Sequence, residues 1–321
     1  MLSYVARRIL FSIPVLLIAS FLLFTAVRAT FDPTARLRAS RDPEAVQRAR
    51  AELGLDKPVV AQYQDWLSGF VRGDWGESSS TQERVLPVIR RAAWHTFQLV
   101  VWGVLISAIL AVAVGVFSAV RQYSIADHAL TGMSFLGLAM PPFWFGLIAI
   151  QFLAVYPRDW FGLTQTPLFF VGLRSSTNVG FGDYARHLVL PVLTLTVQII
   201  ASWSRYQRSS MLDALSGDYV RTARAKGVPR RRVIFKHAFR NALIPLVTVM
   251  ALDIGALAGG LVVTEQIFSI PGMGRLFVDS LLEGDANVLV AWTVVTATSV
   301  IAFNLLADVL YRLLDPRIRF S

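Results

Sequence analysis

The chain alternates long apolar stretches with polar segments. Five stretches carry no charged residue, and a sixth, 242–264, contains only one acid, Asp253. A hydrocarbon layer about 30 Å thick is crossed by roughly 20 residues of helix, and only structures that satisfy their own backbone hydrogen bonds are stable inside it. The pattern therefore predicts an all-α, polytopic integral membrane protein with six transmembrane helices. The five uncharged stretches are 9–27, 96–120, 129–157, 188–204 and 286–307.

Proline and glycine modify two of these stretches. Pro141 and Pro142 are adjacent within the third stretch. Because proline lacks a backbone N–H and clashes with the preceding turn, we expect a kink or break there. Gly255 and Gly259 in the fifth stretch form a small-xxx-small pair, which permits close helix approach. The pattern leaves open whether the partner helix belongs to this chain or to another subunit.

Composition agrees with a membrane protein and excludes several kinds of site. Apolar residues make up 55% of the 321 residues, charged residues only 16%, and the mean hydropathy is +0.53. With no cysteine, and four histidines scattered without ligand spacing, we expect no metal site. No GxxxxGK[ST] phosphate loop is present, so we expect this chain neither to bind nor to hydrolyse ATP and to hold no cofactor. The predominance of arginine over lysine indicates GC-rich coding and a bacterial source.

The distribution of basic residues predicts an orientation, since Lys and Arg in short loops mark the cytoplasmic side. When the six stretches are placed alternately across the membrane, sixteen Lys and Arg fall on one side. That side also receives both termini and the insert 205–240. We therefore predict a bacterial cytoplasmic (inner) membrane protein with both termini in the cytoplasm. Arg90 and Arg91, just before the second stretch, favour the opposite orientation but are outnumbered.

Four regions follow from this topology: a first transmembrane helix (1–28), an external segment (29–93), a membrane core (94–314) and a cytoplasmic tail (315–321). The external segment predicts a helix over 43–53 that Gly54 ends. Aromatic residues then recur at helical spacing, which favours an ordered cap on the outer face of the bundle over a disordered linker. These residues are Tyr63, Trp66, Phe70 and Trp75.

The insert 205–240 is strongly basic, with ten Lys and Arg against two acids. Asp218 is expected to cap a short helix that runs through Lys226, because a carboxylate accepts first-turn N–H groups. Gly227 suits the left-handed residue that ends such a helix, and Pro229 suits the first turn of a second helix over 230–240. We expect a helix–turn–helix that projects into the cytoplasm. Ala223 and Ala225 would keep its tip slim enough for a partner's groove.

Three interpretations of this insert compete on charge alone. It is a solvated loop near anionic lipid, a nucleic-acid site, or a docking element for a cytoplasmic protein. No aromatic stacking platform is interleaved with the basic residues, and the insert lies between membrane stretches, so a nucleic-acid site is disfavoured.

Residues 218–245, DYVRTARAKGVPRRRVIFKHAFRNALIP, resemble the cytoplasmic EAA loop of ABC-importer permeases, in the form found in the peptide/nickel family. The literal EAA triplet is absent, but Gly227 stands at the glycine position. Two further segments, 53–80 and 264–280, resemble the external segment and the loop after the fifth helix of the B-type permease subunit. The resemblance therefore extends over most of the chain.

The resemblance implies a type I importer permease that moves dipeptides or oligopeptides by alternating access. It also implies a second homologous permease, two cytoplasmic ATPase subunits that hold ATP and Mg, and an external solute-binding protein. Nickel or glutathione uptake within the same family is the alternative substrate class. A secondary transporter or channel is a less favoured alternative, because the chain has one intramembrane acid and no visible repeat. ATPase docking falls on Asp218, Tyr219, Val220, Thr222, Ala223, Ala225, Lys226, Gly227 and Pro229.

Two further sites are hypotheses. Asp253 is the only charged residue within a predicted span, and such residues commonly face a wet cavity or the bundle interior. We expect it to line the translocation path and to contact a cationic group such as a peptide amino terminus; the alternative is a structural hydrogen bond to a neighbouring helix. The loop after the fifth helix is expected to close the external mouth, or else to be a simple turn. Its residues are Glu265, Phe268, Pro271, Gly272 and Gly274.

Overall fold

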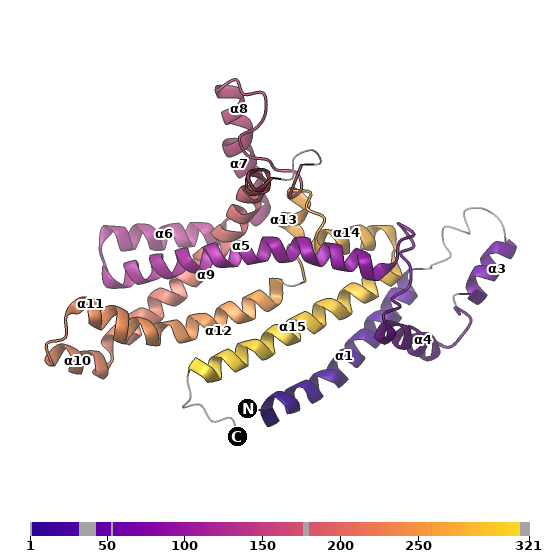
Figure 1. Cartoon of the computed structure of the whole chain (residues 1–321), viewed down its shortest axis with the longest axis horizontal. Helices are drawn as coiled ribbons and strands as arrows, with labels where there is room; N and C mark the ends of the chain where they lie inside the picture. Colours follow the sequence, from indigo (N-terminus) through magenta and orange to yellow (C-terminus); the bar gives the residue numbers. More distant parts are fainter. Residues whose placement is uncertain (1, 32–42, 53, 176–179, 258, 315–321) are drawn as a thin grey trace. The chain divides into compact units, whose positions relative to one another are not determined.

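The computed structural model describes residues 2–31, 43–52, 54–175, 180–257 and 259–314 (Figure 1). The chain forms two compact units. Unit 1 comprises Met1–Thr96, Ala258–Val262 and Pro271–Ile301, and unit 2 comprises Phe97–Leu257, Val263–Ile270 and Ala302–Ser321. Almost all described secondary structure is helical, and the described residues contain an isolated antiparallel bridge, Glu77–Arg84, but no sheet.

Five described helical segments are long and apolar enough to cross a membrane, and a sharply bent helix pair brings the number to six if it counts as one span. This agrees with the six stretches predicted from the sequence. Four of the segments are single helices: α1 (Leu2–Thr30), α5 (Val85–Val120), α9 (Phe181–Ser216) and α15 (Ala286–Leu314). The fifth joins α11 (Arg230–Arg232), the π-helix η2 (Val233–Ala238) and α12 (Phe239–Leu257).

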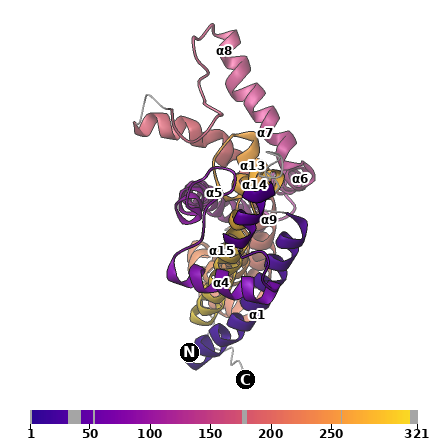
Figure 2. The same cartoon turned by 90° about the vertical axis from the view of Figure 1, so that its right-hand side faces the viewer.

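The bent pair confirms the predicted break at the two prolines. α6 (Ile125–Ala139) meets the segment Pro142–Trp160, which begins with α7 (Pro142–Ile150), at 102°. The Nε2 group of Gln198 in α9 donates to the carbonyl oxygens of Gly137 and Met140, at 3.1 and 2.9 Å, and so satisfies acceptors that the end of α6 leaves free. α7 continues into η1 (Gln151–Val155) and α8 (Tyr156–Trp160). Figures 1 and 2 show the segment from α7 to α8 projecting away from α6 and α9 of the same unit.

Unit 1 contains the polar segment between the first two spans. α3 (Pro43–Glu52) agrees with the predicted helix, whose last residue, Leu53, lies outside the described residues, and Gly54 adopts φ +62°. In α4 (Val59–Arg72), the Tyr63 ring lies 5.2 Å from the ring of Phe21 in α1. The Tyr63 and Ser20 hydroxyl oxygens are 2.7 Å apart. In the described part of this segment Tyr63 thus packs on α1, as an ordered segment requires, and the cap on the outer face of the bundle stays a prediction.

A second polar contact holds the end of this segment. Asp285, fully buried just before α15, accepts hydrogen bonds through Oδ2 from the Ser78 hydroxyl at 2.5 Å and the Ser80 hydroxyl at 3.0 Å. Its Oδ1 accepts from the Val288 backbone N–H at 3.3 Å, in the first turn of α15. One carboxylate thus caps α15 and fixes the loop 78–80, a role that the sequence analysis missed.

Unit 2 is built around α9, which packs against α12, α6 and α7. Trp203 of α9 is completely buried, with Ala111 of α5 and Leu246 of α12 in the same apolar cluster. Gly115 of α5 meets α9 so closely that an added Cβ would lie 2.7 Å from the Ser204 carbonyl oxygen.

The predicted small-xxx-small pair is wrong. α12 ends at Leu257, and Gly259 lies in the turn beyond it, so Gly255 and Gly259 do not share a helix face. Gly255 is buried within α12. The close glycine contact is instead in unit 1, between Gly260, at φ +108°, and Gly274. A Cβ on Gly260 would lie 2.1 Å from the Gly274 nitrogen.

Candidate functional site

The basic insert forms the predicted helix–turn–helix at one end of unit 2 (Figure 1). α10 (Asp218–Ala225) follows α9 after Gly217, and α11 begins at Arg230. Gly227 adopts φ +73°, as predicted, and its N–H donates to the Arg224 carbonyl at 2.9 Å. The residue without a side chain is needed here because other residues rarely adopt this conformation.

Two details of the predicted capping are wrong. The residue that precedes the first turn of α10 is Gly217, which makes no side-chain cap bond, and Asp218 is already helical. The Asp218 side chain is 96% exposed, and its Oδ1 lies 3.5 Å from Nη1 of Arg221. It can still favour the helix through the dipole. Pro229 caps α11 from outside, with ψ 139°, and does not lie in its first turn.

One face of α10 packs against its own chain. Val220 and Ala223 are buried in an apolar cluster with Val116 of α5, Met211 of α9 and Val233 of η2. The prediction that Ala223 slims a tip facing a partner is therefore wrong. Its methyl group is directed inward because three other elements of unit 2 meet at this cluster.

The opposite face of α10 is exposed. Tyr219, Thr222 and Lys226 are three and four residues apart, so they lie on one side of the helix. Seven of the nine predicted docking residues are exposed, and Val220 and Ala223 are the two buried ones. The exposed seven are Asp218, Tyr219, Thr222, Ala225, Lys226, Gly227 and Pro229. The geometry thus presents a short helix with one face fixed to the body of unit 2 and one face free.

A buried ion pair anchors α9 near the helix–turn–helix of α10 and α11. Arg208 donates from Nε and Nη2 to the two carboxylate oxygens of Asp127, each at 2.8 Å, and Asp127 is 1% exposed. Asp127 also accepts from the Ser118 hydroxyl and, at 2.9 Å, from the Tyr123 backbone N–H. The bidentate pair therefore joins α9 to the first turn of α6, which the Ser118 and Tyr123 bonds connect to the end of α5 and the turn after it.

This ion pair was not predicted from the sequence, although one local signal marks Asp127. Ser124 and Asp127 have the S-x-x-D spacing of a helix start, and the Asp127 N–H does donate to the Ser124 hydroxyl at 3.2 Å. The partner, Arg208, lies 81 residues further on. Nothing in local spacing points to it.

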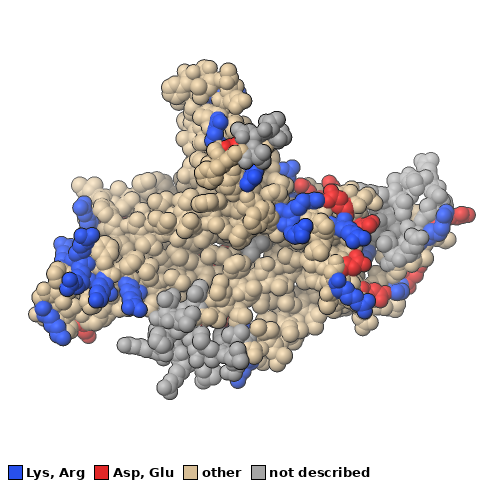
Figure 3. All heavy atoms as spheres, in the orientation of Figure 1, with Lys and Arg blue, Asp and Glu red and all other residues tan. Residues whose placement is uncertain are grey.

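Lys and Arg side chains gather over this end of unit 2 (Figure 3). Four of them line an open groove beside α11 and η2, with a volume of about 790 Å³. These are Arg231, Arg232, Lys236 and Arg240.

Asp253 makes a hydrogen bond to a neighbouring helix, which was the alternative to a place on the translocation path. Nε1 of the buried Trp203 donates to its Oδ2 at 2.7 Å, which joins α9 to α12. The Asp253 residue is only partly buried. A hydrogen bond to a neighbouring helix is therefore confirmed, and the contact with a translocated solute stays a prediction.

Four of the five residues of the predicted outer gate are buried, and Pro271 is exposed. In unit 2, Glu265 of α13 (Val262–Ile267) and Phe268 are fully buried, and the Phe268 carbonyl accepts from the Gly172 N–H at 2.8 Å. In unit 1, the Pro271 carbonyl oxygen lies 3.0 Å from Nδ1 of His95. Gly272 caps α14 (Met273–Glu283), and a Cβ on Gly274 would lie 2.5 Å from the Val262 nitrogen. The gating role stays a prediction.

Within the described ranges, no three His, Cys, Asp or Glu side chains gather as metal ligands would.

Comparisons with known proteins cover the whole chain. Residues 111–320 match the family described as binding-protein-dependent transport system inner membrane component, and residues 1–110 match its N-terminal membrane region. The oligopeptide transport system permease protein AppB of Bacillus subtilis (strain 168) is 41% identical over the full length of both chains. OppB, the oligopeptide permease protein of Mycobacterium tuberculosis (strain H37Rv), is 38% identical over the full length of both.

The dipeptide transport system permease protein DppB of Escherichia coli (strain K12) is 35% identical over 99% of each chain. These matches confirm the resemblance to B-type peptide permeases and agree with a multi-pass helical protein. The chain belongs to the family of binding-protein-dependent transport system inner membrane components.

Proposed function

We propose that this chain is the permease subunit of an ATP-driven importer, and that it forms half of the translocation pathway for dipeptides or oligopeptides. The substrate class rests on relatives 35–41% identical over essentially their whole length, all named as peptide transport permeases. Transport proceeds by alternating access. Since the sequence lacks a phosphate loop, the energy comes from ATP and Mg held by other chains.

The assembly in this proposal contains a second homologous permease, two cytoplasmic ATPase subunits and an external solute-binding protein. It lies in the bacterial inner membrane with both termini in the cytoplasm. The concentration of ten Lys and Arg in the insert 205–240 supports the orientation, because basic loops remain on the cytoplasmic side.

The observation that carries the proposal is the two-sided geometry of α10. Its exposed face, with Tyr219, Thr222 and Lys226, is free to meet an ATPase groove. Its opposite face packs through Val220 and Ala223 on α5, α9 and η2. A displacement of the ATPase would therefore reach three elements of the membrane unit through one rigid contact, as a rigid-body switch requires.

We place Asp253 on the translocation path and the loop from Glu265 to Gly274 at the external mouth. The partial burial of Asp253 supports the first assignment, because the carboxylate keeps lone pairs beyond its bond to Trp203. The close contacts of Gly274 with Gly260 and Val262 support a tightly packed end of this loop.

A bulky substitution on the free face of α10 tests the docking. In Thr222→Trp, the indole blocks a groove but disturbs little of this chain, because among the described residues the Thr222 hydroxyl bonds only to the Asp218 carbonyl one turn back, at 2.9 Å. We expect the permease to lose the ATPase subunits during affinity purification. The control is Ser68→Trp on α4, an exposed residue whose hydroxyl bonds, within the part of the chain that the structure describes, only to the Asp65 carbonyl of its own helix.

The control should retain the ATPase subunits at the wild-type ratio. Full retention in Thr222→Trp would contradict docking on this face. Loss in both variants would trace the effect to general instability and would equally remove the support.

A further inference from the structure

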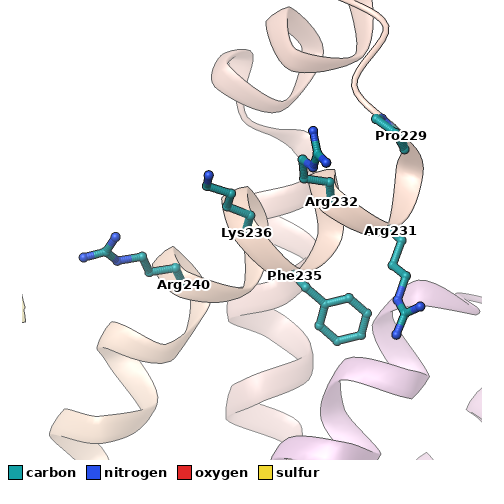
Figure 4. Close-up of a pocket in the computed structure, with 6 residues that line it drawn as sticks. All are labelled: Pro229, Arg231, Arg232, Phe235, Lys236 and Arg240. Carbon is teal, nitrogen blue, oxygen red and sulfur yellow. The ribbon is translucent and has the colours of Figure 1, made fainter.

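The groove beside the insert has the chemistry of an anion site. Its lining residues are Pro229, Arg231, Arg232, Phe235, Lys236 and Arg240 (Figure 4). Four of these six residues are cations and none is an acid. Among the described residues, no carboxylate lies within ion-pair distance of these four. Their charge is therefore available to a ligand.

The helix geometry aligns three of these cations. Arg232, Lys236 and Arg240 follow one another at intervals of four residues through η2 into α12. A π-helix bonds residue i to i+5 and so turns less per residue than an α-helix, which brings positions four to five apart over one another. Figure 4 shows Lys236 and Arg240 extending from the same side of the helix, with Phe235 directed to the other side.

An apolar groove of about 370 Å³ begins where the cationic one ends, because Phe235 lines both. The far side of this second groove comes from α5. Arg121 lies at its edge, with its guanidinium carbon 4.9 Å from the centre of the Phe117 ring. The remaining lining residues are Val112, Ala113, Val116, Val120, Ile234 and Phe239.

The two grooves lie at the end of a membrane-crossing segment. Arg230–Leu257 is long and apolar enough to span, and all four cations lie within its first eleven residues. Long basic side chains at the ends of such helices extend to the headgroup level, where they attract anionic lipid. A cationic part thus adjoins an apolar part at the depth where a phospholipid has its phosphate and the start of its acyl chains.

We propose that this composite groove binds one anionic phospholipid, with its phosphate on Arg232, Lys236 and Arg240 and an acyl chain against Phe235 and Phe239. Guanidinium groups match phosphate oxygens in charge and geometry. An acidic protein surface would satisfy the cations but leave the apolar groove empty. Apart from Pro229, which also belongs to the predicted docking residues, the groove lies outside the free face of α10, and the lipid site does not depend on the proposed docking.

Native mass spectrometry of the full purified chain tests the site. The probes are palmitoyl-oleoyl phosphatidylglycerol and the phosphatidylcholine with the same chains. We expect tighter retention of phosphatidylglycerol. The triple variant Arg232→Gln, Lys236→Gln, Arg240→Gln should weaken that binding about a hundredfold, since each basic residue near an anionic membrane contributes about a factor of five.

The matched control removes three exposed arginines of the same insert that lie outside the groove: Arg221→Gln, Arg224→Gln and Arg230→Gln. Its binding should stay within about threefold of wild type, because general surface charge acts weakly at a distance. Equal losses in both triple variants would overturn the proposal. So would equal retention of the two lipids by the unaltered chain.

Two further measurements keep the test decisive. Lys236→Gln alone changes one exposed side chain and should cost about fivefold in phosphatidylglycerol affinity if the groove binds it. Excess inorganic phosphate distinguishes a lipid from a free anion: we expect the lipid to remain bound, and complete displacement would overturn the acyl-chain part. If the groove triple variant loses ATPase subunits while lipid retention is unchanged, the groove is a protein contact and the proposal fails.

Discussion

Asp285 shows how much one buried side chain holds together in unit 1. Its carboxylate caps α15 and accepts from both Ser78 and Ser80. Asp285→Ala should destabilise the purified chain by about 2–4 kcal/mol, because it removes an N-cap and leaves two hydroxyls without their charged acceptor. Thermal unfolding followed by far-ultraviolet circular dichroism measures the change.

The control lies on the neighbouring helix. Asp279 of α14 is half exposed and pairs with Arg275 at 3.4 Å, one turn away. Exposed pairs of this kind are weak, so Asp279→Ala should change stability by less than about 1 kcal/mol. A loss at Asp279 as large as that at Asp285 would contradict the assigned role of Asp285.

A role of Asp253 in transport can be tested with a substitution that keeps its hydrogen bond to Trp203. Asp253→Asn keeps an oxygen that accepts from Trp203, so stability should stay within about 1 kcal/mol. If the charge meets peptide amino termini, the variant should lower uptake of a free tripeptide relative to its N-acetylated form. An unchanged ratio of the two uptake rates would leave Asp253 with only its structural hydrogen bond.

The packing of α5 on α9 depends on a glycine. A Cβ on Gly115 would lie 2.7 Å from the Ser204 carbonyl oxygen, and backbone cannot yield without moving α9. Gly115→Ala should therefore cost about 1–3 kcal/mol. A Cβ on Gly132 in α6 would meet no heavy atom of the described residues within 4 Å, so Gly132→Ala should stabilise the helix by up to about 1 kcal/mol.

Opposite signs for these two substitutions are the expected result in thermal unfolding of the purified chain. Stabilisation by Gly115→Ala would mean that α5 and α9 do not approach as closely as described.

Among the helices and turns, those features that depend on neighbouring residues were predicted from the sequence. Apolar length located the spans, paired prolines located the break before α7, and Gly227 located the turn after α10. Gly259 was wrongly placed inside the helix, because Gly259 and Gly260 were not interpreted as the turn signal that follows the end of α12 at Leu257.

Which face of α10 is buried depends on residues that lie far away in the sequence. An eight-residue helix with Val220 and Ala223 on one side and Tyr219 on the other is compatible with either face inward. The burial of Ala223 follows from Val116 and Val233, which come from helices far apart in the chain. The Asp127–Arg208 pair could not be predicted from local sequence for the same reason, since its two residues are 81 positions apart.

For the whole molecule, the orientation in the membrane is the first thing to test. The chain has no cysteine, so single introduced cysteines report accessibility without background. Thr222→Cys on α10 and Ser68→Cys on α4 are both at exposed positions. A membrane-impermeant maleimide added to intact bacterial spheroplasts should label Ser68→Cys alone, and Thr222→Cys should react only after lysis. The reverse pattern would invert the predicted topology.

In the proposed function, this chain moves peptide with energy from ATP that is hydrolysed on another chain. Proteoliposomes that contain the complete assembly, with ATP on the side of α10 and binding protein with labelled tripeptide on the other, measure it directly. We expect uptake that requires ATP, stops in Thr222→Trp and persists in Ser68→Trp. Uptake that continues without ATPase subunits, or that an ion gradient alone sustains, would contradict the account.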